Sequence, residues 1–368
     1  MAGYRVAVIG HTGRGDYGHG VDTVWARLPD RCELVAVADA DPQGLSRAAA
    51  KLKAPKAFAD YRKMLDEVRP DIVGIGPRWL DQHRDMVVAA AERGIHVFME
   101  KPFCRSPAEA DQMIAALEKH HVKLAIAHQT RYSPKLQVVR DLILEGKIGK
   151  VLELRGRGKE DARGGGEDLW VLGSHVMNLI HYFGGSPRWC FAEVQQDGEP
   201  VTPKQVRPGN EEIGLLAGDH VTAFYGLDDG AIASFGSHKN ATGNRFGLQI
   251  YGSKGVIEIL TGYLPAAHFL ADPMWSPGRS KTPWVPISSA GLEQPESLTD
   301  GSADAGNQAA IEDLIGAIEM DREPECSAYE GRQTIEMISA VFASHRQGAP
   351  VKMPLAVRSN PLEGWVDS

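Results

Sequence analysis

The sequence predicts an α/β protein of two domains: an N-terminal doubly wound parallel sheet, then an α/β domain with a large, open, mainly antiparallel sheet. Its 368 residues exceed the length over which a single hydrophobic core keeps growing. Short apolar segments alternate with amphipathic ones over residues 4–128, as in successive βαβ units. After about residue 146 the pattern changes to the alternating residues of antiparallel strands.

The first domain is expected to contain six short strands with helices between them. Several of the strands are continuous apolar runs, which indicates that helices cover both faces of their sheet. The expected strands are residues 5–9, 33–38, a short segment near 57, 71–75, 96–99 and 122–127. The expected helices are residues 21–28, 42–52, 62–67, 82–93 and 107–120.

The second domain is expected to begin around a helix at residues 135–145. Residues 271–306 have little periodicity and are expected to be irregular, with helices at 307–320 and 329–346. The expected strands are residues 151–158, 189–194, 220–225, 231–238, 246–251 and 256–260. We therefore divide the chain into domains at 1–130 and 131–353 and a polar tail at 354–368.

Composition excludes several classes of protein. A net charge of -8 argues against a protein that coats nucleic acid, because neutralising phosphates requires clustered Lys and Arg. No apolar run approaches the roughly 20 residues that span a bilayer, and residues 1–5 do not resemble a leader. Four widely separated cysteines fit reduced thiols, and no His, Cys, Asp or Glu spacing is typical of a metal site. These features predict a cytoplasmic protein without a metal.

A glycine-rich segment, residues 10–20, follows the first predicted strand. In this context glycines let backbone amides approach a pyrophosphate closely, and Gly10, Gly13 and Gly15 are the expected contacts. Thr12 stands where a second glycine is usual, so it is a further expected contact in a loop of unusual spacing. The alternative is a glycine-rich turn that binds nothing.

Asp39 ends the second predicted strand, where an acidic residue accepts hydrogen bonds from the adenosine ribose of a dinucleotide. Ala40 follows, and no adjacent Arg or Lys is present to bind a 2′-phosphate, which favours NAD over NADP. Asp39 could instead cap the next helix, but Asp41 is better placed for that role.

The fifth predicted strand ends in Glu100, Lys101 and Pro102, at the edge where open α/β sheets bind ligands. A lysine there can hydrogen-bond a substrate hydroxyl, stabilise the alkoxide and tune a neighbouring base. A solvated lysine beside a turn proline is the alternative.

With these features the chain resembles the Gfo/Idh/MocA family, named for glucose-fructose oxidoreductase and inositol dehydrogenase, over most of its length. Further matching segments are residues 131–134, 146–151, 173–175, 251–255 and 348–351. The resemblance implies an NAD-binding Rossmann domain and a substrate-binding domain whose open sheet often packs against another subunit. A homodimer or homotetramer acting on a sugar-like substrate would follow.

The resemblance also implies roles for individual residues. Lys101 would be catalytic, Glu100 would help to place the nicotinamide side, and His175 would act as an acid or base or bind substrate. By periodicity alone His175 could equally be a core histidine on an apolar helix face. Other expected cofactor contacts are Pro77, His83 and Gln129, and expected substrate contacts are His128, Arg131, Arg157, Lys159 and Asn178.

Several residues depart from the family pattern around the substrate. Asn178 and Val171 stand where relatives often carry aspartates, so the base is His175, Lys101 or a residue from elsewhere. The loop at residues 76–83 is longer than usual and contains a tryptophan. The charged segment 155–168 could supply substrate contacts or be a solvated loop, and His128 could be merely structural.

Three functions are compatible with the sequence. The leading one is reversible hydride transfer between NAD and a secondary alcohol of a sugar, cyclitol or derivative. The second uses NAD transiently, to oxidise a glycoside, eliminate the aglycone and reduce the product again. The third is a sensor that has lost catalysis, against which the retained Lys101 argues.

Overall fold

The computed structural model describes residues 3–239 and 246–365, so the first two residues and the end of the predicted tail lie outside the described residues. The chain forms two compact units. The first contains residues up to 129 together with 210–213 and 302–332, and the second contains 130–209, 214–301 and the residues from 333 onward. Unlike the predicted domains, neither unit is a single continuous segment.

The sheet of the first unit has six parallel strands in the order β3-β2-β1-β4-β5-β6. This order confirms the predicted doubly wound sheet, and the switch point between β1 and β4 is where such sheets bind ligands. The strands are β1 Tyr4–Ile9, β2 Cys32–Ala38, β3 Ala57–Phe58, β4 Ile72–Ile75, β5 His96–Met99 and β6 Leu124–Ile126.

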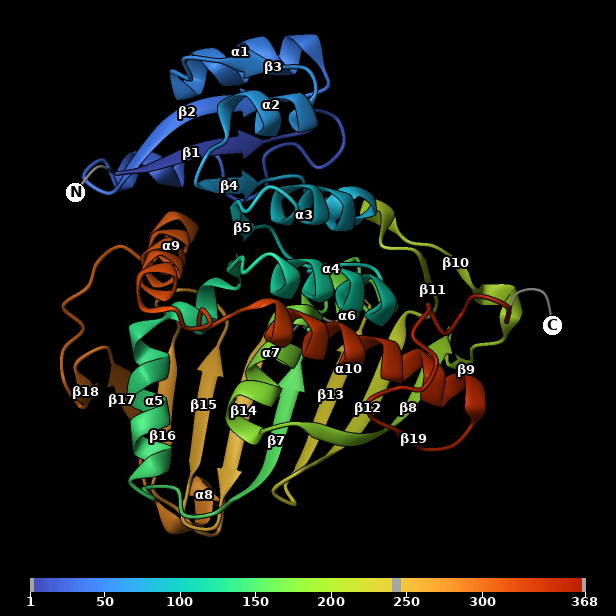
Figure 1. Ribbon diagram of the computed structural model, residues 1–368. Helices are drawn as coiled ribbons and strands as arrows, with labels where there is room; N and C mark the ends of the chain where they lie inside the picture. Colours follow the sequence, from blue (N-terminus) through green and yellow to red (C-terminus); the bar gives the residue numbers. More distant parts are fainter. Residues whose placement is uncertain (1–2, 240–245, 366–368) are drawn as a thin grey trace. The chain divides into compact units, whose positions relative to one another are not determined.

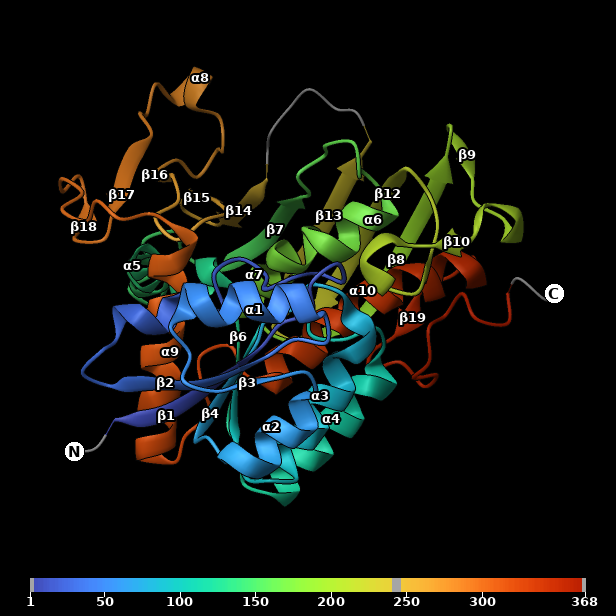
Figure 2. The same ribbon diagram turned by 90° about the horizontal axis from the view of Figure 1, so that it is seen from above.

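Helices cover both faces of this sheet, with α1 on one side and α2, α3 and α4 on the other (Figure 2). A helix from the far end of the sequence, α9, belongs to the same unit and packs against β6 and the 3-10 helix η1. The elements are η1 Val24–Arg27, α1 Pro42–Leu52, α2 Tyr61–Val68, η2 Leu80–Gln82, α3 His83–Ala91, α4 Pro107–Lys119 and α9 Ala303–Met320.

The first predicted helix, at residues 21–28, is wrong in kind. Only the four-residue 3-10 helix η1 forms there, and turns occupy the chain before it. Gly18 and Gly20 have φ of 65° and 87°, which is not helical backbone. The turns continue through residues 21–23, so helical backbone is limited to Val24–Arg27.

The second unit contains a long sheet in the order β18-β17-β16-β15-β14-β7-β13-β12-β8-β19, antiparallel except where β7 pairs with β13. This confirms the predicted large, mainly antiparallel sheet. The central strands are β7 Val151–Arg157, β8 Pro187–Gln196, β12 His220–Leu227, β13 Ile232–His238, β14 Gly247–Gly252 and β15 Val256–Leu260. The outer strands are β16 Ala267–Leu270, β17 Val285–Ser288, β18 Gly291–Leu292 and β19 Val351–Lys352.

Helices cover one face of this sheet (Figure 1). On that face a Cβ added to Gly156 would lie 2.5 Å from Val176 of helix α7, and the buried Tyr225 hydroxyl donates to the Met337 carbonyl of α10. The opposite face carries exposed Phe191 and Phe224, which are direct register partners. The helices are α5 Pro134–Leu144, α6 Gly166–Val171, α7 Gly173–Gly184 and α10 Ala328–Gln347.

Residues 271–306, predicted to be irregular, contain the short helix α8 Pro277–Ser280 and the edge strands β17 and β18. The strands β17 and β18 are four and two residues long, which is too short to give a periodic pattern. Two further pairings were not predicted from the sequence. One is the two-stranded ribbon of β10 (Arg207–Pro208) and β11 (Leu215–Leu216), and the other is the pairing of β8 with β9 (Glu199–Pro200). Among the described residues, no helix combines the length and apolar character that crossing a membrane requires.

Candidate active site

The glycine-rich loop after β1 is held by the Asp39 carboxylate at the end of β2. Asp39 Oδ2 accepts hydrogen bonds from the Thr12 hydroxyl at 2.6 Å and from the Tyr17 hydroxyl at 2.8 Å. The Thr12 amide lies 3.1 Å from both carboxylate oxygens, and the Asp41 amide donates to Oδ1 at 2.9 Å. Burial raises the pKa of Asp39, but the bonds from Thr12, Asp41 and Tyr17 outweigh it and leave the pKa below its usual value. Asp39 is therefore a pre-organised anionic acceptor.

Asp39 does not cap helix α1. The cap is Asp41, whose side chain accepts from the Gly44 amide at 2.6 Å. The alternative role considered for Asp39 is thus taken by its neighbour, as the sequence favoured. Gly44 lies directly under Thr12 and Asp39, because an added Cβ would stand 2.0 Å from Thr12 Oγ1.

The glycines of the loop have backbone conformations that side chains rarely adopt. Gly13 and Gly15 have φ of 80° and 88°, and space is open where a Gly13 Cβ would stand. A Cβ on Gly15 would lie 2.4 Å from the Arg78 amide nitrogen. An exposed glycine beside an anionic acceptor is a backbone that a dinucleotide can approach closely, so this region fits the adenosine half of NAD.

The same loop crosses to the end of β5 and binds Glu100. Both the backbone amide and ring Nδ1 of His19 point at Glu100 Oε1, at 2.5 and 2.8 Å, while Oε2 accepts from the Lys101 amide at 3.0 Å. Glu100 is fully buried, which raises its pKa, but hydrogen bonds from His19 and the charge of Lys101 dominate and leave the pKa lowered. Only glycine fits at position 18 without a shift of the structure, because an added Cβ would stand 2.4 Å from Glu100 Cγ.

Lys101 follows directly, with 6% of its surface exposed, at the carboxyl end of β5. The turn that follows Lys101 contacts the side chain of His83, which is completely buried. Its Nε2 lies 2.7 Å from the Pro77 carbonyl and its Nδ1 lies 3.0 Å from the Pro102 carbonyl. His83 therefore connects the loops after β4 and β5 through their backbones.

Arg14 and Trp79 connect the glycine-rich loop to the loop after β4. The Arg14 guanidinium lies 4.9 Å from the centre of the Trp79 ring and bonds Asp81 at 2.6 Å. The Arg78 amide donates to the Gly15 carbonyl at 3.2 Å. Trp79, the tryptophan noted in this loop of the sequence, thus contacts Arg14 of the glycine-rich loop.

Asn307, in α9, completes this side of the first unit and was not identified from the sequence. Its side chain is buried, donates to the His19 carbonyl at 2.8 Å and accepts from Gln129 Nε2 at 3.1 Å. No local pattern distinguishes Asn307 from other helix residues. His128, beside Gln129, is 2% exposed and lies just after β6.

In the second unit, His175 lies in the first turn of α7 and is half-buried. Its ring meets Phe246 edge to face, with 6.1 Å between centroids. The adjacent Val176 and Ile180 face the sheet and are fully buried. His175 is therefore not among the fully buried residues of this helix.

Arg131 and Asn178 lie together in a buried polar network. Arg131 Nη1 donates to the Asn178 side-chain oxygen at 3.2 Å, and its guanidinium lies 4.2 Å from the centre of the Tyr182 ring. Asn178 Nδ2 also contacts His181 at 3.4 Å and the Thr334 hydroxyl at 3.3 Å. The structure thus brings together two of the predicted substrate contacts, and each has protein partners.

Arg157 and Lys159 are each paired with a nearby acid. Arg157 bonds Glu160, and Lys159 Nζ lies 3.6 Å from Asp161. Because side chains alternate along β7 and Gly156 faces α7, Arg157 points to the opposite face of the sheet. The structure therefore separates Arg157 from the helix that carries His175.

The charged segment after β7 also encloses Asp168, which is completely buried. Its Oδ2 accepts from the Ser237 hydroxyl at 2.6 Å and the Glu160 amide at 3.1 Å. Burial is the main cause that raises the pKa of Asp168 above its usual value. A Cβ on Gly158 would lie 2.0 Å from Asp168 Oδ2, so this carboxylate is closely covered by the loop that it holds.

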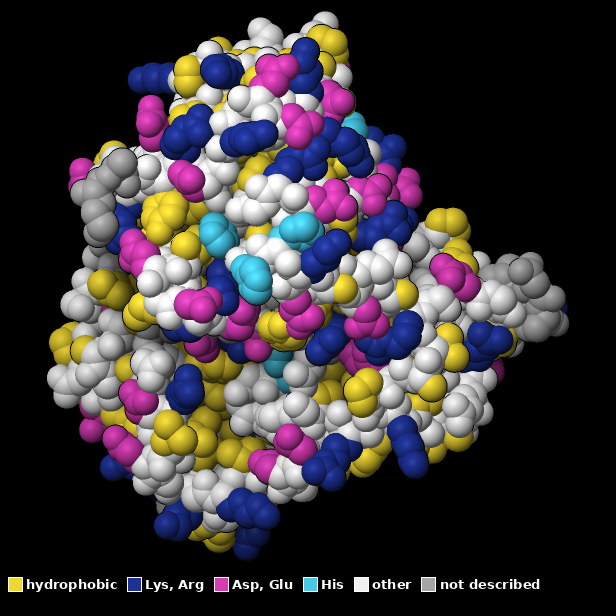
Figure 3. Space-filling view, in the orientation of Figure 1, with side chains coloured by type: hydrophobic (Ala, Val, Ile, Leu, Met, Phe, Trp, Pro, Cys, Tyr) yellow, Lys and Arg dark blue, Asp and Glu magenta, His cyan; other side chains and the backbone are white. Residues whose placement is uncertain are grey.

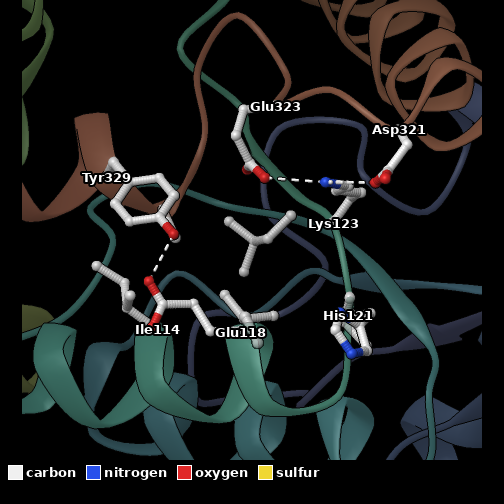
Figure 4. Close-up of a pocket in the computed structure, with 11 residues that line it drawn as sticks. Ile114, Glu118, His121, Lys123, Asp321, Glu323 and Tyr329 are labelled. Atoms are coloured by element: carbon white, nitrogen blue, oxygen red, sulfur yellow. Dashed lines mark hydrogen bonds and ion pairs between the residues drawn. The ribbon is translucent and has the colours of Figure 1, made fainter.

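A cavity of about 230 Å³ in the first unit lies elsewhere (Figure 4). It is bounded by α4, the chain entering β6 and the segment after α9, with Lys123 between Asp321 and Glu323 and with Tyr329 bonded to Glu118. These residues are at the amino end of β6, whereas Asp39 and Lys101 are at carboxyl ends of their strands. The cavity is therefore not part of the candidate site.

The face of the molecule in Figure 3 shows acidic and basic side chains interspersed, without a continuous basic patch. Among residues 3–239 and 246–365, no group of three or more His, Cys, Asp or Glu side chains is arranged to hold a metal ion.

Two family models match the chain. Residues 4–128 match the oxidoreductase family with an NAD-binding Rossmann fold, and residues 140–353 match the C-terminal α/β domain of the same family. The two matches together cover most of the chain.

Two curated relatives that the chain is similar to are named as dehydrogenases. Levoglucosan dehydrogenase of Pseudarthrobacter phenanthrenivorans is 26% identical over 60% of this chain and 63% of its own length. Myo-inositol 2-dehydrogenase of Thermotoga maritima is 28% identical over 69% of this chain and 74% of its own length.

Solved structures share the fold over nearly the whole chain. A levoglucosan dehydrogenase in complex with NADH and L-sorbose has a TM-score of 0.78 at 20% identity, covering 96% of this chain and 100% of that one. An oxidoreductase domain protein of Kribbella flavida has a TM-score of 0.77 at 22% identity, covering 96% of this chain and 100% of that one. The resemblance seen in the sequence is confirmed: the chain belongs to the Gfo/Idh/MocA family of NAD-dependent oxidoreductases.

Proposed function

We propose that this protein transfers hydride reversibly between NAD and a secondary alcohol of a sugar, cyclitol or derivative. The observation that carries the proposal is the almost buried Lys101 beside the anionic Glu100 at the carboxyl edge of the NAD-binding sheet. A lysine in this setting can hold a substrate hydroxyl and stabilise the developing alkoxide.

The residues of the first unit supply the cofactor site. Gly10, Thr12, Gly13 and Gly15 would lie along the pyrophosphate and Asp39 would accept from the adenosine ribose. NAD, when bound, supplies the hydride acceptor. On the nicotinamide side the expected contacts are Pro77, His83, Glu100 and Gln129, of which His83 acts by holding the backbones at Pro77 and Pro102.

Lys101 and His175 would manage the proton of the substrate hydroxyl. Asn178 cannot serve as a proton acceptor, and its amide is engaged by Arg131, His181 and Thr334. His175 is half-buried, with its ring against Phe246, and is not enclosed like Val176 and Ile180. We retain as proposed substrate contacts His128, Arg131, Arg157, Lys159 and Asn178. Arg131 and Asn178 bond each other, so their proposed role is to hold neighbouring side chains in position.

The test is to mix purified protein with NAD and a panel containing levoglucosan, D-apiose, myo-inositol and chromogenic glycosides. Relatives named for the first three act as dehydrogenases, which makes these compounds reasonable probes. NADH absorbance and aglycone release are followed together. NADH formed in step with substrate consumption supports the proposal, whereas aglycone release without net NADH would favour transient oxidation. Binding of NADH without any turnover across a broadened panel would favour the sensor.

We also propose that the open face of the large sheet joins two copies into a homodimer or homotetramer. On this face Phe191 and Phe224 are 44% and 42% exposed, and Ile232 is 39% exposed. Arg155 and Glu153, which bond each other, add charges of both signs to this face, and a two-fold interface would bring the same patch of both copies together. Light scattering of the wild type should show an oligomer, and Phe224→Glu should dissociate it. The control Leu144→Glu, at an exposed position on α5, should leave the oligomer intact. A monomeric wild type would contradict the proposal. The four cysteines are buried and are not joined in disulfides in the described part of the chain, which supports a reducing, cytoplasmic location that fractionation of cells would test.

A further inference from the structure

The Asp39 carboxylate already receives as many hydrogen bonds as its oxygens can accept. An ionised carboxylate offers about four lone-pair sites. Four donors occupy these sites: the Thr12 and Tyr17 hydroxyls bond Oδ2, the Asp41 amide bonds Oδ1, and the Thr12 amide is shared between both oxygens. A ribose hydroxyl can therefore bond Asp39 only by replacing one of these donors.

Among these donors, Tyr17 is the one that can leave at least cost to the structure. The Thr12 and Asp41 amides are fixed by the backbone that follows β1 and β2. The Tyr17 hydroxyl comes from the middle of the loop, between Gly15 and Gly18, whose φ values are both positive. Its side chain is half-exposed, so it can turn toward solvent about rotatable bonds without moving the strands.

The Tyr17 ring also covers Gly10, the first glycine of the loop. A Cβ added to Gly10 would lie 2.1 Å from Tyr17 Cε1 and 2.2 Å from Cζ. Rossmann loops use glycine so that cofactor phosphates can approach the backbone closely. Here the space next to that backbone holds the phenol ring, whose hydroxyl is at the same time on Asp39.

We propose that Tyr17 and the adenosine half of NAD compete for Asp39 and for the space over Gly10, so that Tyr17 sets the affinity for the cofactor. Bound dinucleotide exchanges the Tyr17 hydroxyl for a ribose hydroxyl on Oδ2. Burial and then Asp39 raise the pKa of Tyr17 above its usual value, so the phenol remains a protonated donor at neutral pH. This inference depends on NAD binding by the family and not on the identity of the substrate.

The first measurement is the dissociation constant of ADP-ribose and of NADH, by calorimetry, for the wild type, Tyr17→Phe and Tyr17→Ala. Removing one bond to a charged acceptor should tighten ADP-ribose binding about tenfold in Tyr17→Phe. Tyr17→Ala, which also clears the space over Gly10, should bind at least as tightly. Tyr61→Phe on α2 is the matched control and should bind like the wild type.

A double-mutant cycle shows whether the gain acts through Asp39. In an Asp39→Ser background, Tyr17→Phe should no longer tighten ADP-ribose binding, because the shared acceptor is absent. The same tenfold gain in that background would show that Tyr17 acts elsewhere.

The second measurement follows the cofactor response in wild-type protein labelled with 3-fluorotyrosine, and a variant is used only for assignment. The ¹⁹F resonance of Tyr17, assigned by its loss in Tyr17→Phe, should shift on adding ADP-ribose and stay in place with nicotinamide mononucleotide. A resonance unmoved by saturating ADP-ribose, or Tyr17 variants that bind it no more tightly than the wild type, would overturn the proposal. Either result leaves the proposed hydride transfer to be judged by turnover alone.

Discussion

His19 binds Glu100 twice, because its backbone amide and its ring Nδ1 both point at the same carboxylate oxygen. The carboxylate is completely enclosed, whereas the His19 side chain is 45% exposed. Tyr17, two residues earlier, bonds Asp39. One short loop therefore connects the acid expected at the adenosine ribose with the acid beside the predicted catalytic lysine.

His19→Ala should destabilise the protein by about 1–3 kcal/mol, because a buried carboxylate loses a hydrogen-bond partner that nothing replaces. The loss is measured as the free energy of unfolding in urea at neutral pH. His120→Ala, at the C-terminal cap of α4, serves as the control. Equal stability of wild type and His19→Ala would show that the backbone amide alone satisfies Glu100.

The lowered pKa of Glu100 predicts a specific pH dependence of stability. The unfolded group has the ordinary value of about 4.3, so its contribution is complete above that pH and is lost as pH falls toward the lower folded value. Between about pH 5 and 3, wild type should lose stability more steeply than Glu100→Gln, by at most about 1.4 kcal/mol per pH unit. Parallel curves would show that the pKa of Glu100 is not lowered.

Lys101→Met should reduce turnover by about 10²–10⁴-fold, the range typical for loss of a positioned acid or base. NADH affinity should change little, because the expected cofactor contacts belong to other residues. Steady-state kinetics and NADH fluorescence separate the two effects, and exposed Lys119→Met on α4 is the control. Turnover within a few-fold of wild type would contradict the catalytic assignment.

Asp39→Ser should weaken NADH binding about tenfold or more, as expected for loss of a charged hydrogen-bond acceptor, and NADPH binding much less. A carboxylate attracts the ribose hydroxyls but repels a 2′-phosphate, so its removal penalises only the first. Fluorescence titration with both cofactors provides the comparison. Equal losses would contradict the ribose assignment.

Asn307→Ala should weaken NADH binding several-fold and lower stability by about 1–3 kcal/mol. The change leaves Gln129 Nε2 and the His19 carbonyl without the amide that joins them. The neighbouring Gln308→Ala, on a more exposed part of α9, is the matched control. Unchanged thermal stability and NADH affinity would show that water replaces the amide.

The parts of the site that the sequence predicted are those fixed by local patterns. Asp39 and Lys101 each follow a buried strand, and parallel strands bring their carboxyl ends to one edge of the sheet. The contacts of Tyr17 with Asp39 and of His19 with Glu100 join residues 22 and 81 positions apart, and no periodic pattern encodes such pairs.

The same contacts explain why the first helix was predicted incorrectly. The sequence shows apolar residues at helical spacing after Gly20. It does not show that Tyr17 bonds Asp39 at the end of β2 while His19 bonds Glu100 at the end of β5. Turns continue from that part of the chain to Thr23, and η1 occupies only Val24–Arg27. Tertiary contacts here override a local preference.

Helix α9 lies far along the sequence from the rest of the first unit, which affects how this unit folds during translation. Residues 302–332 belong to the first unit but are synthesised long after residue 129. At roughly 5–20 residues per second, this interval lasts on the order of 10–35 s. Until then, the surface that later contacts the buried Ile311, Leu314 and Ile315 has no helix to cover it. The newborn first unit should therefore be a client of chaperones that shield apolar surface during translation.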